Sequence, residues 1–430
     1  MKNNFIKSTI ILVIFGLITK VLGMVIKICL TRVISTHGIG IYSLILPTFN
    51  LFITLCSMGI PIAISKLISE NKYNGKLVVL PIIPIILFVN VLLIILLIII
   101  APFVSNNLLK NSITYYPIVA IGITLPFICI SSILKGYFFG KQEMFPSSLS
   151  NIIEQFVRLI LTIFLIPKLI KYGYSVSISG VVLINVISEL SSIICLLFFV
   201  NRNIKINLSD FKYNSIIFKD IISVSLPSTG SRLIGSFSMF LEPIIITLVL
   251  LKCGYSNKFI TYQYGIINGY VYPLLLLPSF FSLAISNALM PVVSNFYSHN
   301  NLKYTKYKIK QAIIISLIIG IPCTFLFISF PHYFLKLIYN TNEGIVYIKY
   351  VAPVFLLFYI QGPLTSSMQG MNMAKEAMYG TLIGAMLKNI LLFTLSFLHI
   401  GIWGLIISNS FNIVFVTFHH LFCVYLKLKK

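Results

Sequence analysis

Long apolar runs separated by short polar stretches cover the whole chain. A helix needs about 20 apolar residues to cross a hydrocarbon core of roughly 30 Å. The runs lack the two-residue alternation of transmembrane strands, so we predict an all-α integral membrane protein with twelve transmembrane helices. The predicted spans are residues 8–30, 41–65, 77–104, 115–139, 147–170, 176–200, 221–251, 262–296, 311–334, 345–368, 377–398 and 402–426.

The composition agrees with this pattern. The 430 residues are 58% hydrophobic and 10% charged, with a mean hydropathy of +0.99, whereas roughly 25% of residues are charged in soluble domains. The seven cysteines form no CxxC pair, and the chain has no Walker loop, G-x-S-x-G or H-E-x-x-H motif. We therefore expect no metal, no cofactor and no enzymatic activity.

The net charge of +23, from 32 Lys and Arg against 9 Asp and Glu, bears on orientation. In a soluble protein such a charge would suggest nucleic acid, but a membrane protein keeps its basic loops in the cytoplasm. With the N-terminus inside, the inner segments hold 19 Lys and Arg and the outer segments hold 8. We predict a multi-pass protein of the bacterial plasma membrane with both termini in the cytoplasm and no nucleic-acid partner.

The two halves of the chain resemble each other at an offset near 230 residues. Six spans in each half make the two repeats parallel, and the site of a transporter built in this way lies between the repeats. We predict an N-terminal lobe over 1–200, a cytoplasmic linker over 201–220 and a C-terminal lobe over 221–430. The matched pairs are Gly136 with Gly370, Arg158 with Lys388, Gly180 with Gly404, Asn185 with Asn409 and Pro61 with Pro291.

Ionisable side chains within the spans point to the substrate, because such groups are costly in lipid and usually face a cavity or each other. Five cations face three acids, which leaves two positive charges in excess. Four of the cations fall roughly 18–20 Å above the inner ends of their spans. A cavity of this charge attracts an anion, above all a phosphate or pyrophosphate. The cations are Lys20, Lys27, Arg158, Arg232 and Lys388, and the acids are Glu154, Glu189 and Glu242; Arg32 extends the basic line outward.

Structural explanations compete with the cavity role. The i, i+4 spacing of Glu154 and Arg158 equally fits a neutralised pair on one helix. Lys388 could pair with Glu189 or Glu242 and hold the lobes together. Lys27 and Arg32 fit interfacial anchors as well, whereas Lys20 and Arg232 have no acidic residue three or four positions away, which favours a cavity role for both.

Several glycine-containing motifs along the chain have a specific order and spacing. The opening Gly16-x-x-x-Lys20-Val-Leu-Gly23, followed by Gly38-x-Gly40-Ile-Tyr42, resembles the start of the stage V sporulation protein B family. Tyr264-Gly265-Ile-Ile-Asn-Gly269 resembles its eighth helix, and Gly401-Ile-Trp-Gly404 the start of its twelfth. The family belongs to the multidrug/oligosaccharidyl-lipid/polysaccharide exporter superfamily, which includes the lipid II flippases.

The resemblance implies two six-helix lobes that form a V-shaped central cavity, and export of a lipid-linked, pyrophosphate-bearing precursor. It carries a functional cation onto Lys20, and less firmly onto Lys27, where relatives usually have Arg with its bidentate fork. Many relatives carry two further helices that form a groove for the lipid tail. The sequence in hand ends at Lys430, so the groove is not carried over, and how the tail passes stays open.

Together these features lead to a hypothesis. The chain is a flippase for a polyprenyl-pyrophosphate-linked sugar, in which Lys20, Lys27 and Arg232 bind the pyrophosphate. Arg32, Arg158 and Lys388 set the charge of the cavity, and Glu189 or Glu242 couples transport to H+ or Na+. The Lys-, Ile- and Asn-rich composition suggests a low-GC bacterium, and the resemblance implies a role in spore cortex peptidoglycan. The alternatives are a cation-coupled multidrug antiporter and a non-transporting scaffold for wall synthesis.

Overall fold

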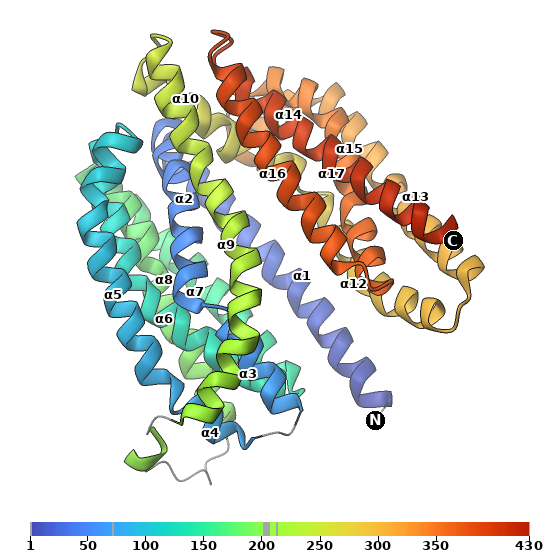
Figure 1. The fold of residues 1–430 in the computed structure, drawn as a ribbon. Helices are drawn as coiled ribbons and strands as arrows, with labels where there is room; N and C mark the ends of the chain where they lie inside the picture. The colour runs from blue at the N-terminus through green and yellow to red at the C-terminus, as the bar shows by residue number, and fades with distance from the viewer. Residues whose placement is uncertain (1, 71–72, 201–206, 212–213, 430) are drawn as a thin grey trace. The chain divides into compact units, whose positions relative to one another are not determined.

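The computed structural model describes residues 2–70, 73–200, 207–211 and 214–429 (Figure 1). All regular elements in these residues are helices, and they include twelve candidate membrane spans. The predicted all-α fold with twelve spans is therefore confirmed. The chain divides into two compact units, which we call unit 1 (residues 1–34 and 44–240) and unit 2 (residues 35–43 and 241–430).

Unit 1 is organised around α6, which packs against α3, α5 and α8, while α7 packs against α1 and α8. Short 3₁₀ and π turns, η1 to η4, join or extend these helices. The helices are α1 (Lys2–Val33), most of α2 (Thr36–Ser57), α3 (Ile60–Ser69), α4 (Gly75–Val79), α5 (Ile82–Phe103), η1 (Val104–Leu108), η2 (Ser112–Thr114), α6 (Tyr115–Gly140), α7 (Met144–Leu169), η3 (Ile170–Tyr172), α8 (Tyr174–Phe199), η4 (Leu208–Phe211) and the first part of α9 (Ser215–Lys252).

Unit 2 is organised around α15, which packs against α12, α13 and α17, while α16 packs against α17. This is the same arrangement that α6 has with α3, α5 and α8 in unit 1. The remaining elements are α10 (Asn257–Ile266), the π-helical η5 (Ile267–Val271), α11 (Tyr272–Leu275), α12 (Ser279–Ser298), α13 (Leu302–Ser329), α14 (Pro331–Tyr339), α15 (Ile345–Gly370), α16 (Ala374–Ser396) and α17 (Trp403–Lys429).

Backbone geometry repeats at an interval of 230 residues. Helices α6 and α15 both have 26 residues and begin 230 positions apart. Two pairs of left-handed residues have the same spacing: Lys110 (φ 49°) with Asn340 (φ 56°), and Gln142 (φ 60°) with Asn372 (φ 61°). Positive φ is uncommon outside glycine, so its recurrence at matched turns supports the repeat seen in the sequence.

One matched pair in the sequence is displaced by a helical turn. The sequence pairs Gly370 with Gly136, but Gly370 is the last residue of α15 and Gly140 is the last residue of α6. A Cβ at Gly140 would lie 2.9 Å from the backbone oxygen of Ser65, and a Cβ at Gly370 would lie 2.9 Å from that of Met290. Gly140 is therefore the structural counterpart, because each of these two glycines ends its helix against the backbone of a neighbouring helix.

The two compact units divide inside α9, between Phe240 and Leu241. A 38-residue helix is about 57 Å long, and its two parts contact different units. Ser236 hydrogen bonds to Thr54 at 2.9 Å in unit 1, whereas Glu242 pairs with Lys388 in unit 2. The predicted linker over 201–220 stays a prediction, because residues 201–206 and 212–213 lie outside the described residues.

The start of α2 belongs to unit 2 because it crosses α10 at backbone contact. A Cβ at Gly265 would lie 2.6 Å from the carbonyl oxygen of Thr36, and a Cβ at Gly40 would collide with that of Thr261. Small residues at a crossing let two membrane helices approach this closely. Gly40 and Gly265, both singled out in the sequence motifs, therefore have a packing role.

Two predicted elements need correction. The basic segment 297–310 lies between two predicted spans, which predicts a cytoplasmic loop, but most of it is helical, because α12 runs to Ser298 and α13 begins at Leu302. The Asn301 side chain accepts a hydrogen bond from the Tyr304 backbone N–H at 3.2 Å at the start of α13. The predicted span 262–296 is not one helix, because it breaks between α11 and α12. Proline lacks the N–H that would continue the helix, and Pro278 stands at this break. The Tyr359 hydroxyl donates to the carbonyl oxygen of Leu275 there at 2.7 Å.

Candidate functional site

The two lysines of α1 lie within a candidate membrane span, residues 14–33. Lys20 and Lys27 are seven residues apart, so they share one face of the helix at a separation of about 10 Å. Lys20 is exposed and Lys27 is half-buried. Neither forms a hydrogen bond or ion pair with a residue that the structure describes. These positive charges are available to a ligand.

Helix α1 packs against α7 beside these lysines. A Cβ at Gly23, which lies between Lys20 and Lys27 in the chain, would stand 3.7 Å from Oε1 of Gln155 on α7. The ring of Phe15 contacts that of Phe145 with centroids 5.8 Å apart. The pair of helices therefore holds the lysines next to the polar part of α7.

The two arginines with a predicted role near the substrate, Arg32 and Arg232, lie on different helices. Arg32 is exposed in the last turn of α1, and Arg232 is exposed on the part of α9 that belongs to unit 1. Arg232 makes no ion pair or hydrogen bond with any described residue. Its proposed contact with pyrophosphate stays a prediction.

Arg158 is not a free cation, because it belongs to a buried charge cluster on α6 and α7. Its Nη2 lies 2.8 Å from Oε1 of Glu154, and Nζ of Lys135 lies 2.9 Å from Oε2. The Gln155 amide also donates to Oε1 of Glu154 at 3.3 Å. The neutralised i, i+4 pair allowed by the sequence is present. Lys135 was missed, because its place near the end of a span suggested a loop charge.

Glu189 lies on α8 next to this cluster, but its side chain forms no ion pair with a described residue. The residue is 7% exposed. The Ser131 hydroxyl lies near its carboxyl group, while Oε2 is buried with no hydrogen-bond partner among the described residues. Buried carboxyl oxygens nearly always have a hydrogen-bond partner, so an Oε2 without one among the described residues needs an explanation.

Lys388 is held by an ion pair in unit 2. Its Nζ lies 2.6 Å from Oε2 of Glu242 on α9, and the Tyr264 hydroxyl donates to Oε1 at 3.0 Å. Beside this pair, the Asn409 amide donates to the Tyr272 hydroxyl at 3.0 Å. The pairing with Glu242 that the sequence allowed is present, but it joins two helices of one unit rather than two lobes. The sequence singled out Tyr264 in a family motif and Asn409 in the internal repeat, but it did not indicate the hydrogen bonds that either residue makes here.

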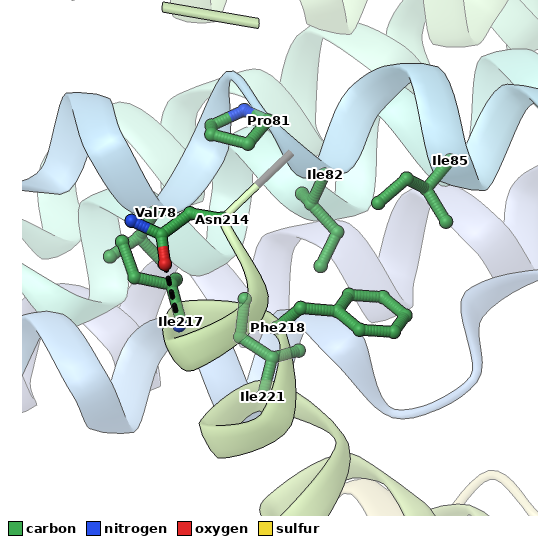
Figure 2. Close-up of a pocket in the computed structure, with 8 residues that line it drawn as sticks. All are labelled: Val78, Pro81, Ile82, Ile85, Asn214, Ile217, Phe218 and Ile221. Atoms are coloured by element: carbon green, nitrogen blue, oxygen red, sulfur yellow. Dashed lines mark hydrogen bonds between the residues drawn. The ribbon is translucent and has the colours of Figure 1, made fainter. Parts of the chain in front are cut away.

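A separate apolar pocket of about 200 Å³ lies between α4, α5 and the start of α9 (Figure 2). Its walls include Val78, Ile82 and Ile85 on one side and Ile217, Phe218 and Ile221 on the other. The side chain of Asn214 accepts hydrogen bonds from the backbone N–H groups of Ile216 and Ile217 and so caps α9. None of the described residues that line this pocket is charged, so the pocket as described does not suit a pyrophosphate.

Two polar contacts hold the same end of α9 and the adjoining segment in place. Nζ of Lys76 lies 2.6 Å from Oδ2 of Asp210, and the Tyr73 hydroxyl donates to Asp220 at 2.8 Å. The hydrogen bond from Lys76, together with one from the Asn207 backbone, lowers the pKa of Asp210 below its usual value. Among the described residues, no group of three His, Cys, Asp or Glu side chains could hold a metal.

Comparisons with known proteins extend over nearly the whole chain. A family model described as "polysaccharide biosynthesis protein" matches residues 5–297, and a model described as MatE matches residues 268–395. Stage V sporulation protein B of Bacillus subtilis (strain 168) is 36% identical over 430 residues, which cover 97% of this chain and 83% of the relative. Lipid II flippase MurJ of the same organism is 23% identical, over 91% of this chain and 77% of the relative.

Solved structures show the same fold. A multidrug resistance transporter of the MATE family, in the MOP superfamily and in an inward-facing conformation, superposes with a TM-score of 0.77 at 15% identity. The superposition covers 96% of this chain and 94% of the transporter. At this level of identity the likeness concerns the fold alone.

Proposed function

Because the chain belongs to the polysaccharide biosynthesis protein family, we propose that it moves a polyprenyl-pyrophosphate-linked cell-wall or polysaccharide precursor across the bacterial plasma membrane. The chain is a multi-pass membrane protein of the flippase and exporter class. In the proposed cycle the precursor passes from the inner to the outer leaflet by alternating access, with both termini of the chain in the cytoplasm.

The observation that carries this proposal is the pair of unpartnered lysines on α1. Keeping Lys20 and Lys27 charged within a membrane span is costly, and no carboxylate among the described residues offsets that cost. A diphosphate on the substrate would provide the missing negative charge through charge-assisted hydrogen bonds. Arg232 is proposed as a third contact to the same group.

The remaining charges have supporting roles in this proposal. Arg158 and Lys388, which are already paired, would set the field along the substrate path rather than bind the substrate, and Arg32 would extend that field at the end of α1. Glu189 or Glu242 would couple transport to an ion gradient of H+ or Na+. The name of the 36% identical relative, stage V sporulation protein B, supports a role in sporulation, and we propose that the precursor serves spore cortex peptidoglycan.

Transport by purified protein in liposomes tests the lysine assignment. Each charge-assisted hydrogen bond is worth about 1.5–3 kcal/mol, so Lys20→Ala and Lys27→Ala should each lower kcat/KM for flipping by about 10- to 100-fold. Lys27→Arg should retain or improve activity, because the guanidinium can bind diphosphate in a bidentate manner. Lys171→Ala, at an exposed lysine of η3, is the matched control. Wild-type rates in both α1 variants at normal abundance would refute the assignment.

A second candidate function is a cation-coupled multidrug antiporter, which the MatE match over 268–395 and the MATE fold favour. This function predicts drug sensitivity in a deletion strain, loss of resistance in Glu189→Gln or Glu242→Gln, and tolerance of Lys20→Ala. Accumulation of one lipid-linked sugar in the deletion strain, without drug sensitivity, would decide for the flippase. Full complementation by a Lys20→Ala, Lys27→Ala double variant would instead favour a scaffold for wall synthesis.

A further inference from the structure

Glu189 is a buried carboxyl group that the described side chains satisfy only in part. It is 7% exposed, and Oε2 has no hydrogen-bond partner among the described residues. It also lies in no ion pair there, because the two nearby cations, Lys135 and Arg158, both bind Glu154. Burying a carboxylate without a counter-ion is so costly that such a group normally takes up a proton.

The groups that face Glu189 come from each element packed around α8. Helix α6 contributes Ser131 and Lys135, helix α7 contributes Glu154 and Arg158, and the Cys56 thiol approaches from the end of α2. With both carboxylates ionised, the three charged groups of α6 and α7 and the charge of Glu189 sum to zero. A proton on Glu189 removes one negative charge while both bonds of Glu154 to its cations stay intact.

We infer that Glu189 carries an exchangeable proton, and that this proton is the ion that drives the proposed transport. The coupling part of this inference rests on the proposed function, whereas the presence of the proton does not. The proton comes from water on one side of the membrane and returns to water on the other, and no other bond changes. A proton suits this place better than Na+, because Lys135 and Arg158 repel a second cation and a proton needs only one oxygen lone pair.

Within unit 1, Glu189 is connected through its neighbours to the stretch of α1 that carries the two lysines. Glu154, next to Glu189, accepts a hydrogen bond from Gln155, which lies against Gly23 between Lys20 and Lys27. An ionised Glu189 would compete with Glu154 for Lys135 and Arg158 and so disturb the position of Gln155. Loss of the proton is therefore expected to change how α1 packs on α7, and with it the placement of the pyrophosphate-binding lysines.

Infrared spectroscopy of the purified full chain in nanodiscs tests the proton itself, without any substrate. A C=O band of a neutral carboxylic acid should be present at pH 7, absent in Glu189→Gln and present in Glu143→Gln, an exposed glutamate at the start of α7. Glu189→Asp keeps a carboxyl group and should show a shifted band, which separates loss of the proton from misfolding. A spectrum that Glu189→Gln does not alter at any pH from 5 to 9 would overturn the inference. So would a band that disappears on addition of NaCl but not of KCl.

Liposomes with an imposed pH gradient and no membrane potential test the coupling. The wild-type flipping rate should change by up to about tenfold per pH unit of gradient, because one pH unit is one decade of proton activity. Glu189→Gln should lose this response, and Glu143→Gln should keep it. Wild-type transport that ignores the gradient would overturn the coupling and leave the flippase standing. Absence of any wild-type flipping would overturn the flippase, while the infrared result would still decide whether Glu189 holds a proton.

Discussion

Arg158 on α7 and Lys388 on α16 occupy matching positions of the two repeats, but they find different partners. Glu154 stands four residues before Arg158, so Arg158 pairs along its own helix at 2.8 Å. Gly384 stands four residues before Lys388, so Lys388 reaches across to Glu242 on α9 at 2.6 Å. The residue four positions before the cation thus differs between the repeats. With glutamate there, the cation pairs within its own helix, and with glycine there, the cation pairs with an acid on another helix.

The two arrangements also differ in redundancy. Glu154 has both Lys135 and Arg158 as partners, whereas Glu242 has Lys388 and the neutral hydroxyl of Tyr264. Removing one partner of a buried ion pair leaves a charge that the low-dielectric surroundings cannot stabilise. The cluster in unit 1 should therefore tolerate the loss of a cation better than the pair in unit 2 does.

The largest effect is expected at Lys388. The side chains of Lys388 and Glu242 are 8% and 12% exposed, and breaking such a pair costs about 3–5 kcal/mol. Lys388→Met should lower the free energy of unfolding by this amount, measured by reversible unfolding in micelles. A Lys388→Met, Glu242→Leu double variant should recover most of the loss. A double variant no more stable than the single one would show that the ion pair is not the source of the effect.

The second-largest loss in the free energy of unfolding is expected at Gly384, which stands four residues before Lys388, where the other repeat has a glutamate. A Cβ at Gly384 would lie 2.6 Å from Oδ1 of Asn412 and 2.7 Å from Cγ2 of Val416. Gly384→Ala should therefore cost about 1–3 kcal/mol through overpacking against α17, read from the same unfolding curves. Gly16→Ala, where nothing lies within 4 Å of the added Cβ, is the matched control and should be neutral or slightly stabilising.

A smaller effect is expected at Arg158. Arg158→Met leaves Glu154 bound to Lys135, so about 1–2 kcal/mol should be lost, at the lower end of the cost of an unmet polar partner. The difference between this loss in the free energy of unfolding and the loss in Lys388→Met is what tests the redundancy of the cluster. Equal losses in the two variants would mean that Lys135 does not compensate, and that the two regions are held together more similarly than their contacts suggest.

The smallest effect should come from the ion pair of Lys76, at the start of a candidate membrane span, with Asp210, which lies outside the spans. The lowered pKa of Asp210 means that the pair stabilises the fold above the ordinary pKa of aspartate, and that this contribution fades as the pH falls through the lowered value. Hydrogen exchange near the start of α9 should therefore speed up at low pH in the wild type. Asp210→Asn should show fast exchange already at pH 7. Identical exchange in both proteins would show that the pair does not hold this segment.

The sequence predicts the fold well because hydropathy alone marks a membrane span. It also predicts the bond between Glu154 and Arg158, since i, i+4 spacing is a local property of one helix. It leaves open which acid meets Lys388, because that depends on how α9 and α16 pack. Lys135 escaped notice for a similar reason, since charges near the end of a span usually reach water.

The break between α11 and α12 shows the same limit. An apolar run predicts one span, and the prolines at 273 and 278 hint at a kink but not at two separate helices. Where the freed carbonyl groups find donors depends on tertiary contacts, which no local pattern records.

The hydroxyl of Tyr359 makes the main chain of one helix depend on a side chain of another. It occupies the place of the amide hydrogen that Leu275 would otherwise meet one turn later. Its ring packs closely against Gly320, where an added Cβ would lie 2.7 Å from Cδ2 of the ring. An exchange between tyrosine and phenylalanine at this position adds or removes a single oxygen atom and, with it, the hydrogen bond to Leu275. Such an exchange would change how the break between α11 and α12 is held without replacing any residue of the break itself.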